Sequence, residues 1–210
     1  MAYTVLPKQT EVVLNTLKSL PWMKPYYLAG GTALALQYNH RQSIDLDWFN
    51  QKDIQTTALI AELSELGDFE LTQHEKNTVE GMLDEVKVSF MTYPYPLLEP
   101  VVLYEDSVPL AHPTDIALMK LGAIARRNTK KDFIDLYLFL QKNDMNLQEL
   151  LRLTEKKFPK VKYDLVHLYK SLVYFTEADQ EPMPNMITKI QWKEVKNFFE
   201  QEVKTAIKNK

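Results

Sequence analysis

The stretch from Tyr26 to Phe49 constrains the fold of this chain most, because it combines a sharp turn with two neighbouring acids. It reads YYLAGGTALALQYNHRQSIDLDWF: an apolar segment, a glycine pair, a helical run, and a second apolar segment that carries Asp45 and Asp47. Residues two apart on a strand point to the same face, so the two carboxylates are expected to lie side by side. Neighbouring carboxylates repel each other unless a cation lies between them, and oxygen ligands suit a hard ion such as Mg2+ or Mn2+.

An exposed edge strand would also tolerate both aspartates. Their apolar neighbours argue against that alternative and predict a central strand with one apolar face: Ile44, Leu46, Trp48 and Phe49. Two acids on one face of a central strand need a reason, and a metal ion is the natural one.

The glycine pair predicts an anion site beside these acids. Backbone amides at a helix start bind anions, and Gly30 and Gly31 would let a phosphate approach closely, with Thr32 as a side-chain donor. Arg41 could contact a triphosphate, and Ser43 also precedes the acids. A simple tight turn for the glycines and a surface ion pair for Arg41 are the alternatives. A phosphate site next to a metal site suggests nucleotide chemistry.

Composition indicates an ordinary globular protein of one domain or two small ones, with 210 residues, 45% hydrophobic and 25% charged. The absence of cysteine excludes disulfides and thiolate metal sites. Neither a signal pattern nor an apolar run of membrane-span length is present, so we expect a cytoplasmic protein with no membrane partner.

Charge is distributed unevenly along the chain. Residues 1–114 carry 7 basic and 15 acidic side chains, a net charge of −8, whereas residues 115–210 carry 18 and 13, a net charge of +5. A metal-binding half beside a polyanion-binding half would produce this asymmetry, and so would random scatter of surface charge.

Apolar periodicity predicts an α+β domain over residues 1–110 and a helical domain over residues 111–210. In the first domain we expect helices at 10–20, 32–39 and 53–66, and strands at 25–29, 43–49, 69–74, 77–83, 86–91 and within 101–110. In the second we expect helices at 115–127, 130–143, 146–157, 163–175 and 191–207, with a loop over 177–186.

Two helices of the second domain carry charges in apolar surroundings. Lys120 and Arg127 are seven residues apart and share a helix face, where they could neutralise substrate phosphates or extend along the surface into solvent. Asp132 and Asp135 are neighbours on the next helix, and the apolar residues around Asp135 predict partial burial against a cation such as Lys120 or Arg127. That ion pair would be structural, but it would also place both helices over the site.

The remaining candidate motifs give weaker indications of function than the glycines, aspartates and cations above. The four histidines lack metal-ligand spacing and are expected in turns or the core: His40, His74, His112 and His167. No GxxxxGK motif is present, which excludes a P-loop protein. A lysine run predicts a solvated face, with RNA contact as the alternative: Lys156, Lys157, Lys160 and Lys162.

The segments LAGGTALAL, HRQSIDLDWF, DIALMKLGAIARR and KKDFIDLYLFL follow each other in this order across residues 26–141. Together they resemble the AbiEii-type nucleotidyltransferase toxin family, a branch of the polymerase-β-like nucleotidyltransferase superfamily. The resemblance implies a small mixed sheet with flanking helices, followed by a C-terminal helical bundle. It also implies Mg2+-dependent transfer of a nucleoside monophosphate from an NTP to an RNA, such as the tRNA 3′ end, or to a protein hydroxyl. Such toxins act in toxin–antitoxin or phage-defence systems, and an antitoxin encoded beside the toxin neutralises it.

The resemblance also implies roles for individual residues. Gly30 and Gly31 match the family's phosphate-binding glycine motif, and Asp45 and Asp47 match its metal-binding DxD motif. Lys120 matches the lysine that faces the nucleotide.

Further matches lie around these positions. Asp132 and Asp135 match a KDxxD-type motif in which an aspartate is implicated in catalysis. Arg41, Ser43 and Arg127 match recurring positions without an assigned role.

One position departs from the superfamily pattern. A third carboxylate often follows on a later strand in a pattern like KVDF, and here that segment reads Lys87-Val88-Ser89-Phe90. Serine cannot act as a carboxylate base or as an anionic metal ligand. Either another acid such as Asp132 or Asp135 substitutes for it, or the enzyme works without that group, or the chain is a catalytically weak nucleotide-binding or protein-interaction module.

Overall fold

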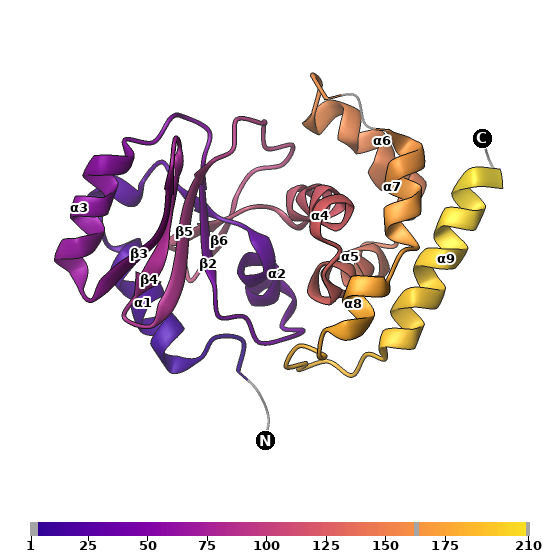
Figure 1. Ribbon diagram of the computed structural model, residues 1–210, viewed down its shortest axis with the longest axis horizontal. Coiled ribbons are helices and arrows are strands. Elements are labelled where there is room, and N and C mark those ends of the chain that lie inside the picture. Colours follow the sequence, from indigo (N-terminus) through magenta and orange to yellow (C-terminus); the bar gives the residue numbers. More distant parts are fainter. Residues whose placement is uncertain (1–3, 162–163, 209–210) are drawn as a thin grey trace.

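The computed structural model describes residues 4–161 and 164–208, and it places a mixed sheet at one end of the molecule and a group of helices at the other (Figure 1). Within these ranges the sheet has seven strands in the order β3-β4-β5-β2-β1-β7-β6. β2 is parallel to β5 and β1 is parallel to β7, whereas the other neighbours are antiparallel. The strands are β1 (Tyr27–Leu28), β2 (Leu46–Asn50), β3 (Phe69–Glu75), β4 (Thr78–Leu83), β5 (Val86–Thr92), β6 (Val102–Tyr104) and β7 (Val108–Leu110). The expected mixed sheet and the central position of β2 are both confirmed.

Helices cover both faces of this sheet. α1 (Lys8–Lys18) contacts β5, and α3 (Thr56–Leu66) contacts β3 and β4, on the face away from the helical part (Figure 1). α2 (Gly30–Tyr38) lies on the other face and packs against α4 and α5 (Figure 1). The second face of the sheet therefore looks toward the helical part.

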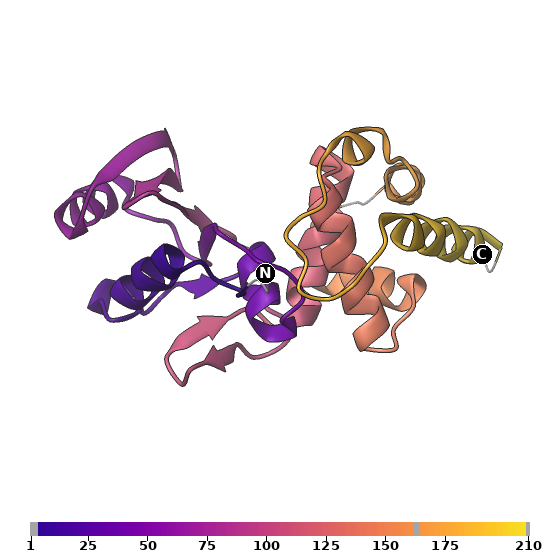
Figure 2. The same cartoon turned by 90° about the horizontal axis from the view of Figure 1, so that it is seen from below.

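The helical part begins at α4. Its helices in the described ranges are α4 (Pro113–Arg127), α5 (Lys130–Lys142), α6 (Leu147–Lys157), α7 (Leu165–Leu172), α8 (Thr176–Gln180) and α9 (Trp192–Lys208). Buried hydrophobic residues form one cluster from Leu6 to Ile116 and another from Ala117 to Ala206, so the core changes in the first turn of α4. The second view shows the same two parts at opposite ends (Figure 2). The predicted domain boundary after residue 110 lies just before this change and stays a prediction.

Several predicted elements differ from the observed ones. β2 begins at Leu46 rather than at residue 43, because the Ser43 amide donates to the Val5 carbonyl (2.8 Å) and the Asp45 carbonyl accepts from Thr32, outside the strand ladder. Ile44 is consequently 57% exposed, so its assignment to the buried face of a strand was wrong.

Three more differences concern turns and helix ends. The single strand predicted within 101–110 is the hairpin β6–β7, whose turn is formed by Glu105 and Asp106 in left-handed backbone conformations. α8 occupies part of the predicted loop 177–186. The helix predicted at 163–175 is the shorter α7, and residue 163 lies outside the described residues.

Lys157 contradicts the expectation of a solvated lysine run, because its side chain is fully buried. Its ammonium donates to Asp115 (2.6 Å) and to the Pro96 carbonyl (2.7 Å). Asp115 also accepts from the backbone amides of Leu98 and Glu99. This network holds the proline-rich segment 93–100 against α4 and α6.

A second connection joins the two parts on the other side. The His40 carbonyl accepts from the amides of Ile187 (2.9 Å) and Thr188 (3.0 Å), and the Gln42 amide donates to the Asn185 carbonyl (2.8 Å).

Within the described residues, no helix combines the length and the apolar character that crossing a membrane requires.

Candidate functional site

The two aspartates predicted to bind metal lie at the start of β2. Asp47 is within the strand on the face toward the helices, and Asp45 precedes it with its side chain 31% exposed. The Ser89 hydroxyl donates to Asp47 Oδ1 (2.5 Å), because the parallel register of β2 and β5 places the two residues opposite each other. Burial raises the pKa of Asp47, and the negative charge of Asp45 raises it further. An additional cation would relieve this repulsion.

Gly30 brings the start of α2 against Asp47. Its φ of 67° lies in the left-handed region, and a Cβ at this position would lie 2.6 Å from Asp47 Oδ2. α2 begins at Gly30, two residues earlier than predicted, so both glycines belong to its first turn. The first amides of a helix have no partner within it, and here they lie beside the carboxylate.

Thr32 and Ser43 lie beneath the site rather than on its surface. Both side chains are buried, and their hydroxyls are 2.8 Å apart. The Thr32 hydroxyl also donates to the Asp45 carbonyl. The pair therefore fixes the backbone of Asp45 relative to α2.

Asp135 is the centre of a buried group of charges. Its carboxylate accepts two hydrogen bonds from the Arg41 guanidinium (2.8 and 2.9 Å), one from His40 (2.8 Å), and pairs with Lys120 (2.6 Å). Burial alone would raise the pKa of Asp135, but the charges of Arg41 and Lys120 hold it well below its usual range. A Cβ on Gly31 would overlap Arg41 Nη2, so the guanidinium lies directly against the first turn of α2.

Asp132 is paired as completely as Asp135. It accepts from Lys120 (2.6 Å), from Arg127 (2.7 and 3.0 Å) and from the Thr129 hydroxyl (2.8 Å). Burial opposes ionisation, but the charges of Lys120 and Arg127 keep the pKa of Asp132 far below its usual range. The predicted pairing of Asp135 with Lys120 is confirmed, and the ion pairs of Asp132 with Lys120 and Arg127 come in addition to it. Neither carboxylate has an exposed side-chain surface.

The chain matches a known protein family over nearly its whole length. The model of the family described as nucleotidyl transferase AbiEii toxin, type IV toxin–antitoxin system, matches residues 12–209. This chain belongs to the AbiEii nucleotidyltransferase toxin family. The resemblance found in the sequence is thereby confirmed.

This AbiEii chain is similar to a further protein in sequence and to a solved structure in fold. An uncharacterised protein of Aquifex aeolicus (strain VF5) is 36% identical over 207 residues, covering 97% of this chain and 98% of the relative. MenT4, a nucleotidyltransferase toxin from Mycobacterium tuberculosis H37Rv, is 14% identical with a TM-score of 0.59, covering 92% of this chain and 81% of MenT4. The similarity to MenT4 shows that the AbiEii chain has a nucleotidyltransferase fold.

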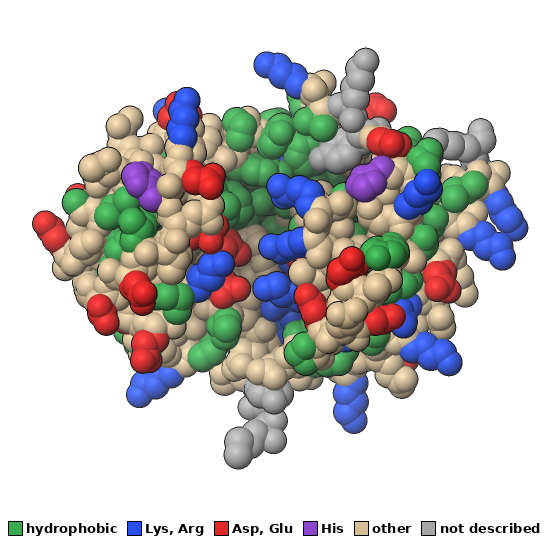
Figure 3. All heavy atoms as spheres, viewed as in Figure 1, with side chains coloured by type: hydrophobic (Ala, Val, Ile, Leu, Met, Phe, Trp, Pro, Cys, Tyr) green, Lys and Arg blue, Asp and Glu red, His purple; other side chains and the backbone are tan. Residues whose placement is uncertain are grey.

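Basic side chains of the helical part face the acids of the sheet part. Lys131 Nζ lies 3.7 Å from Asp45 Oδ2, and the charges of Lys120 and Lys131 both act on Asp47. Arg127, 56% exposed, also interacts electrostatically with Asp47. Figure 3 shows a hollow between the two parts, with acidic side chains along the margin of the sheet part and basic ones along the helical margin. A ligand that carries both a cation and anionic groups would complement the acidic side chains of one margin and the basic side chains of the other.

Asp45 and Asp47 are the candidate metal ligands of this AbiEii protein. Among the described residues, no group of three or more His, Asp or Glu side chains is arranged to hold a metal ion. Asp45 and Asp47 still fit Mg2+, which is commonly held by one or two carboxylates together with substrate phosphates.

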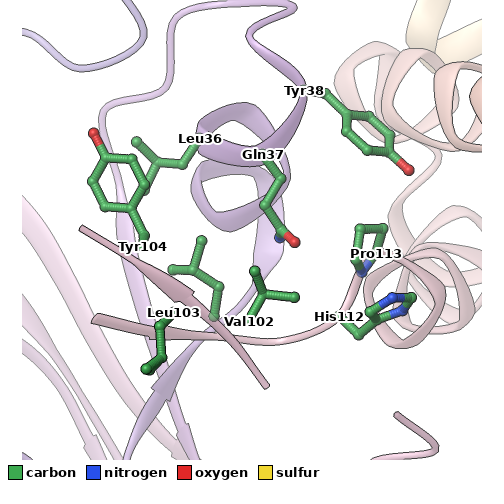
Figure 4. A pocket seen from close by; sticks show the side chains of 9 residues that line it. Leu36, Gln37, Tyr38, Val102, Leu103, Tyr104, His112 and Pro113 are labelled. Atoms are coloured by element: carbon green, nitrogen blue, oxygen red, sulfur yellow. The ribbon is translucent and has the colours of Figure 1, made fainter. Parts of the chain in front are cut away.

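A separate depression of about 400 Å3 lies between α2 and the β6–β7 hairpin (Figure 4). Its lining is chiefly apolar and includes Leu36, Val102 and Tyr104, and it contains none of the predicted site residues. The Gln37 amide donates to the Ala33 and Ala111 carbonyls instead of pointing a free donor into the space. This depression is therefore separate from the residues predicted to form the site.

The structure adds three residues that sequence reasoning did not assign to the site: His40, Thr129 and Lys131. Thr129 precedes α5 and lies three residues before Asp132, a spacing typical of a helix start, and this signal could have identified it. His40 and Lys131 owe their places to contacts across 95 and 86 positions of the chain, which local spacing does not reveal.

Proposed function

We propose that this chain transfers a nucleoside monophosphate from an NTP to a hydroxyl group, with Mg2+ or Mn2+ held by Asp45 and Asp47. One observation carries the proposal: Gly30 sets the start of α2 against Asp47, opposite the basic side chains of α4 and α5. A metal bound there would offset the negative charge that develops on the phosphates during transfer.

The phosphates would be bound by groups on both margins. The free amides of Gly30 and Gly31 are the donors for the triphosphate from the sheet side. From the helical side, Lys120 supplies a positive charge that Asp132 and Asp135 hold in place. Arg127 and Lys131 are more exposed and can follow the phosphates or the acceptor.

The remaining predicted nucleotide-binding residues would act through these groups. Thr32 and Ser43 position Asp45, because the Thr32 hydroxyl donates to the Asp45 carbonyl. Arg41 lies against Gly31 and would support the phosphate-binding turn while neutralising Asp135.

Asp132 and Asp135 serve in this proposal as counter-ions rather than as the general base. A general base must come within hydrogen-bond reach of the proton it removes. Both side chains are inaccessible and already accept hydrogen bonds from cations, so they are weak proton acceptors.

The proposed acceptor is an RNA hydroxyl, such as that of a tRNA 3′ end, or a protein hydroxyl. The net charge of +5 over residues 115–210 supports a polyanionic acceptor on the helical side. Membership of a toxin–antitoxin family supports a cognate antitoxin as the protein partner.

Label transfer tests the proposal directly. The purified protein is incubated with each radiolabelled NTP, Mg2+ and either total tRNA or a protein mixture. We expect transfer by the wild type and its loss in Asp45→Asn and Asp47→Asn. Asp106→Asn is the matched control, because Asp106 lies in the exposed β6–β7 turn and Asn tolerates its left-handed backbone.

A catalytically weak nucleotide-binding or protein-interaction module is the second candidate. Ser89 favours it, because a hydroxyl contacts Asp47 where the superfamily often has a third carboxylate. Calorimetric binding of Mg-NTP without transfer to any RNA or protein would support a nucleotide-binding module. Absence of Mg-NTP binding at millimolar concentration would reject both nucleotide functions and leave a protein-interaction module.

A further inference from the structure

A third acid lies in line with Asp47 and Ser89 across the sheet. Asp47 of β2 is opposite Ser89 of β5, and Ser89 is opposite Glu80 of β4. Residues directly opposite each other on neighbouring strands share a face of the sheet. The ion pair between Glu80 and Lys87 (3.3 Å) agrees with this placement, because Lys87 lies two residues before Ser89 and so shares its face.

The two carboxylate oxygens of Asp47 point in opposite directions along the row formed by Asp47, Ser89 and Glu80. Oδ2 faces Gly30 at the start of α2, and Oδ1 accepts from Ser89 on β5. In phosphoryl transfer the attacking and leaving oxygens lie roughly in line on opposite sides of the phosphorus. If α2 binds the phosphates that leave, the attacking hydroxyl must approach over β5 and β4.

We propose that Glu80 is the proton acceptor for the attacking hydroxyl, supplying from β4 the carboxylate that Ser89 does not supply from β5. This inference rests on the proposed transferase function. β4 is one strand beyond β5, about 5 Å further from Asp47. The glutamate side chain is one methylene longer than aspartate, and serine is the smaller side chain at position 89 between the two acids.

Accessibility separates Glu80 from the two aspartates of α5, and position separates it from Asp45. Its side chain is 23% exposed, and its partner Lys87 is 48% exposed, so an incoming hydroxyl can displace this surface pair. Asp132 and Asp135 have no exposed side-chain surface, and Asp45 lies on the phosphate side of the row.

The proton and electron balance of the step is simple. The acceptor oxygen forms a bond to the α-phosphorus, and the bond between the α-phosphorus and the bridging oxygen to the β-phosphorus breaks. Pyrophosphate leaves with the electron pair of that bond. The acceptor proton moves to a carboxylate oxygen of Glu80 and then to water.

The test compares Glu80→Gln with two controls in the full-length protein. Glu62→Gln is the matched control, because it makes the same change at an exposed position of α3, on the opposite face of the sheet. Lys87→Ala removes the surface ion pair and keeps the carboxylate. For each variant, kcat for label transfer is measured alongside calorimetric Kd for Mg-NTP and the midpoint of thermal unfolding.

We expect Glu80→Gln to lower kcat by about 10²–10⁴-fold, the usual contribution of general acid–base catalysis, with Kd for Mg-NTP and the unfolding midpoint unchanged. Glu62→Gln and Lys87→Ala should transfer label at the wild-type rate. Wild-type kcat in Glu80→Gln, with Asp47→Asn inactive, would overturn the role of Glu80 and leave the proposed function standing.

Two further outcomes would also overturn the role of Glu80. Equal losses in Glu80→Gln and Lys87→Ala would assign the effect to the ion pair. A wild-type protein that binds Mg-NTP but transfers no label would overturn the proposed function and the role of Glu80 together.

Discussion

Two pairs of aspartates face each other in this molecule, and their surroundings are opposite. On the helical side, Asp132 and Asp135 are fully buried and share Lys120 (2.6 Å from each). On the sheet side, Asp45 and Asp47 are partly exposed and lie close enough for the charge of one to raise the pKa of the other. The helical pair is neutralised within the chain, whereas the sheet pair is left with surplus negative charge.

The contrast shows how one residue type can serve the fold in one place and a ligand in another. A carboxylate whose pKa is lowered by fixed cations contributes to stability, and its removal leaves those cations buried. A carboxylate whose pKa is raised by burial and a like charge costs stability and is typical of a functional site.

The largest effect is expected from Asp135→Asn, which keeps the side-chain shape but leaves Arg41 and Lys120 partly uncompensated in the core. Breaking a buried charge pair from one side costs about 3–5 kcal/mol of unfolding free energy. Urea unfolding measures this loss, and Asp47→Asn serves as the control because it should be at least as stable as the wild type. Equal stability of the two variants would erase the distinction between the two pairs.

Acid tests both pairs in a single titration. The folded-state pKa values of Asp132 and Asp135 lie below their unfolded values, so their stabilisation is present above about pH 4 and is lost as the pH falls through the folded values. Asp47 has the opposite sign: its folded pKa lies above the unfolded value, so its ionisation costs stability at neutral pH.

We therefore expect the unfolding free energy of the wild type to fall below about pH 4. The stability advantage of Asp47→Asn should shrink at higher pH, as the pH falls through the raised folded pKa of Asp47 toward the unfolded value, because the wild-type carboxylate becomes protonated there. Urea unfolding at a series of pH values provides the measurement. An advantage that grows on acidification would contradict the sign assigned to Asp47.

Asp47→Asn should nevertheless remove function. Loss of one of two metal-binding carboxylates is expected to lower label transfer by about 10²–10³-fold, similar to the loss of one preorganised electrostatic group. It should also abolish the increase in unfolding temperature that we expect Mg-NTP to produce in the wild type. Retention of that increase would mean that the sheet pair does not hold the metal.

Gly30→Ala should have a smaller effect on stability, about 1–2 kcal/mol, because the left-handed backbone disfavours a Cβ. The added methyl group would also collide with Asp47 Oδ2, so transfer should fall along with stability. Chemical unfolding and label transfer together measure this. A Gly30→Ala variant with normal transfer would show that close contact between α2 and Asp47 is not needed.

Lys131→Ala should change the free energy of unfolding, measured in urea, least of all these variants. Its ion pair with Asp45 is 3.7 Å long and partly exposed, and such pairs contribute about 0–1 kcal/mol. A stability loss comparable to that of Asp135→Asn would place Lys131 among the structural charges instead.

Local patterns predicted much of this arrangement. The helix behind the glycine pair, the position of Asp47 in a central strand and the pairing of Lys120 with Asp135 follow from spacings within a turn, a strand or two consecutive helices. The burial of Lys157 was missed because its partner Asp115 is 42 positions away. No local pattern distinguishes a solvated lysine from one whose counter-ion arrives from another helix.

The alignment of Glu80 with Ser89 and Asp47 was equally hidden from the sequence. It depends on the register of the β4–β5 hairpin and on the parallel pairing of β5 with β2 across 42 positions. Periodicity predicts which face of a strand is apolar, but it does not predict which residue lies opposite which.

The connections on both sides of the hollow have a consequence for motion. Segment 93–100 is held by Lys157 and Asp115, and segment 185–188 is bonded to residues 40–42. Because hydrogen bonds connect the sheet part and the helical part at these two places, the two parts cannot rotate freely about a single hinge. We expect the spacing between the acidic and basic margins to be set before a nucleotide arrives, so binding would cost little domain reorganisation and product release would not wait for the molecule to open.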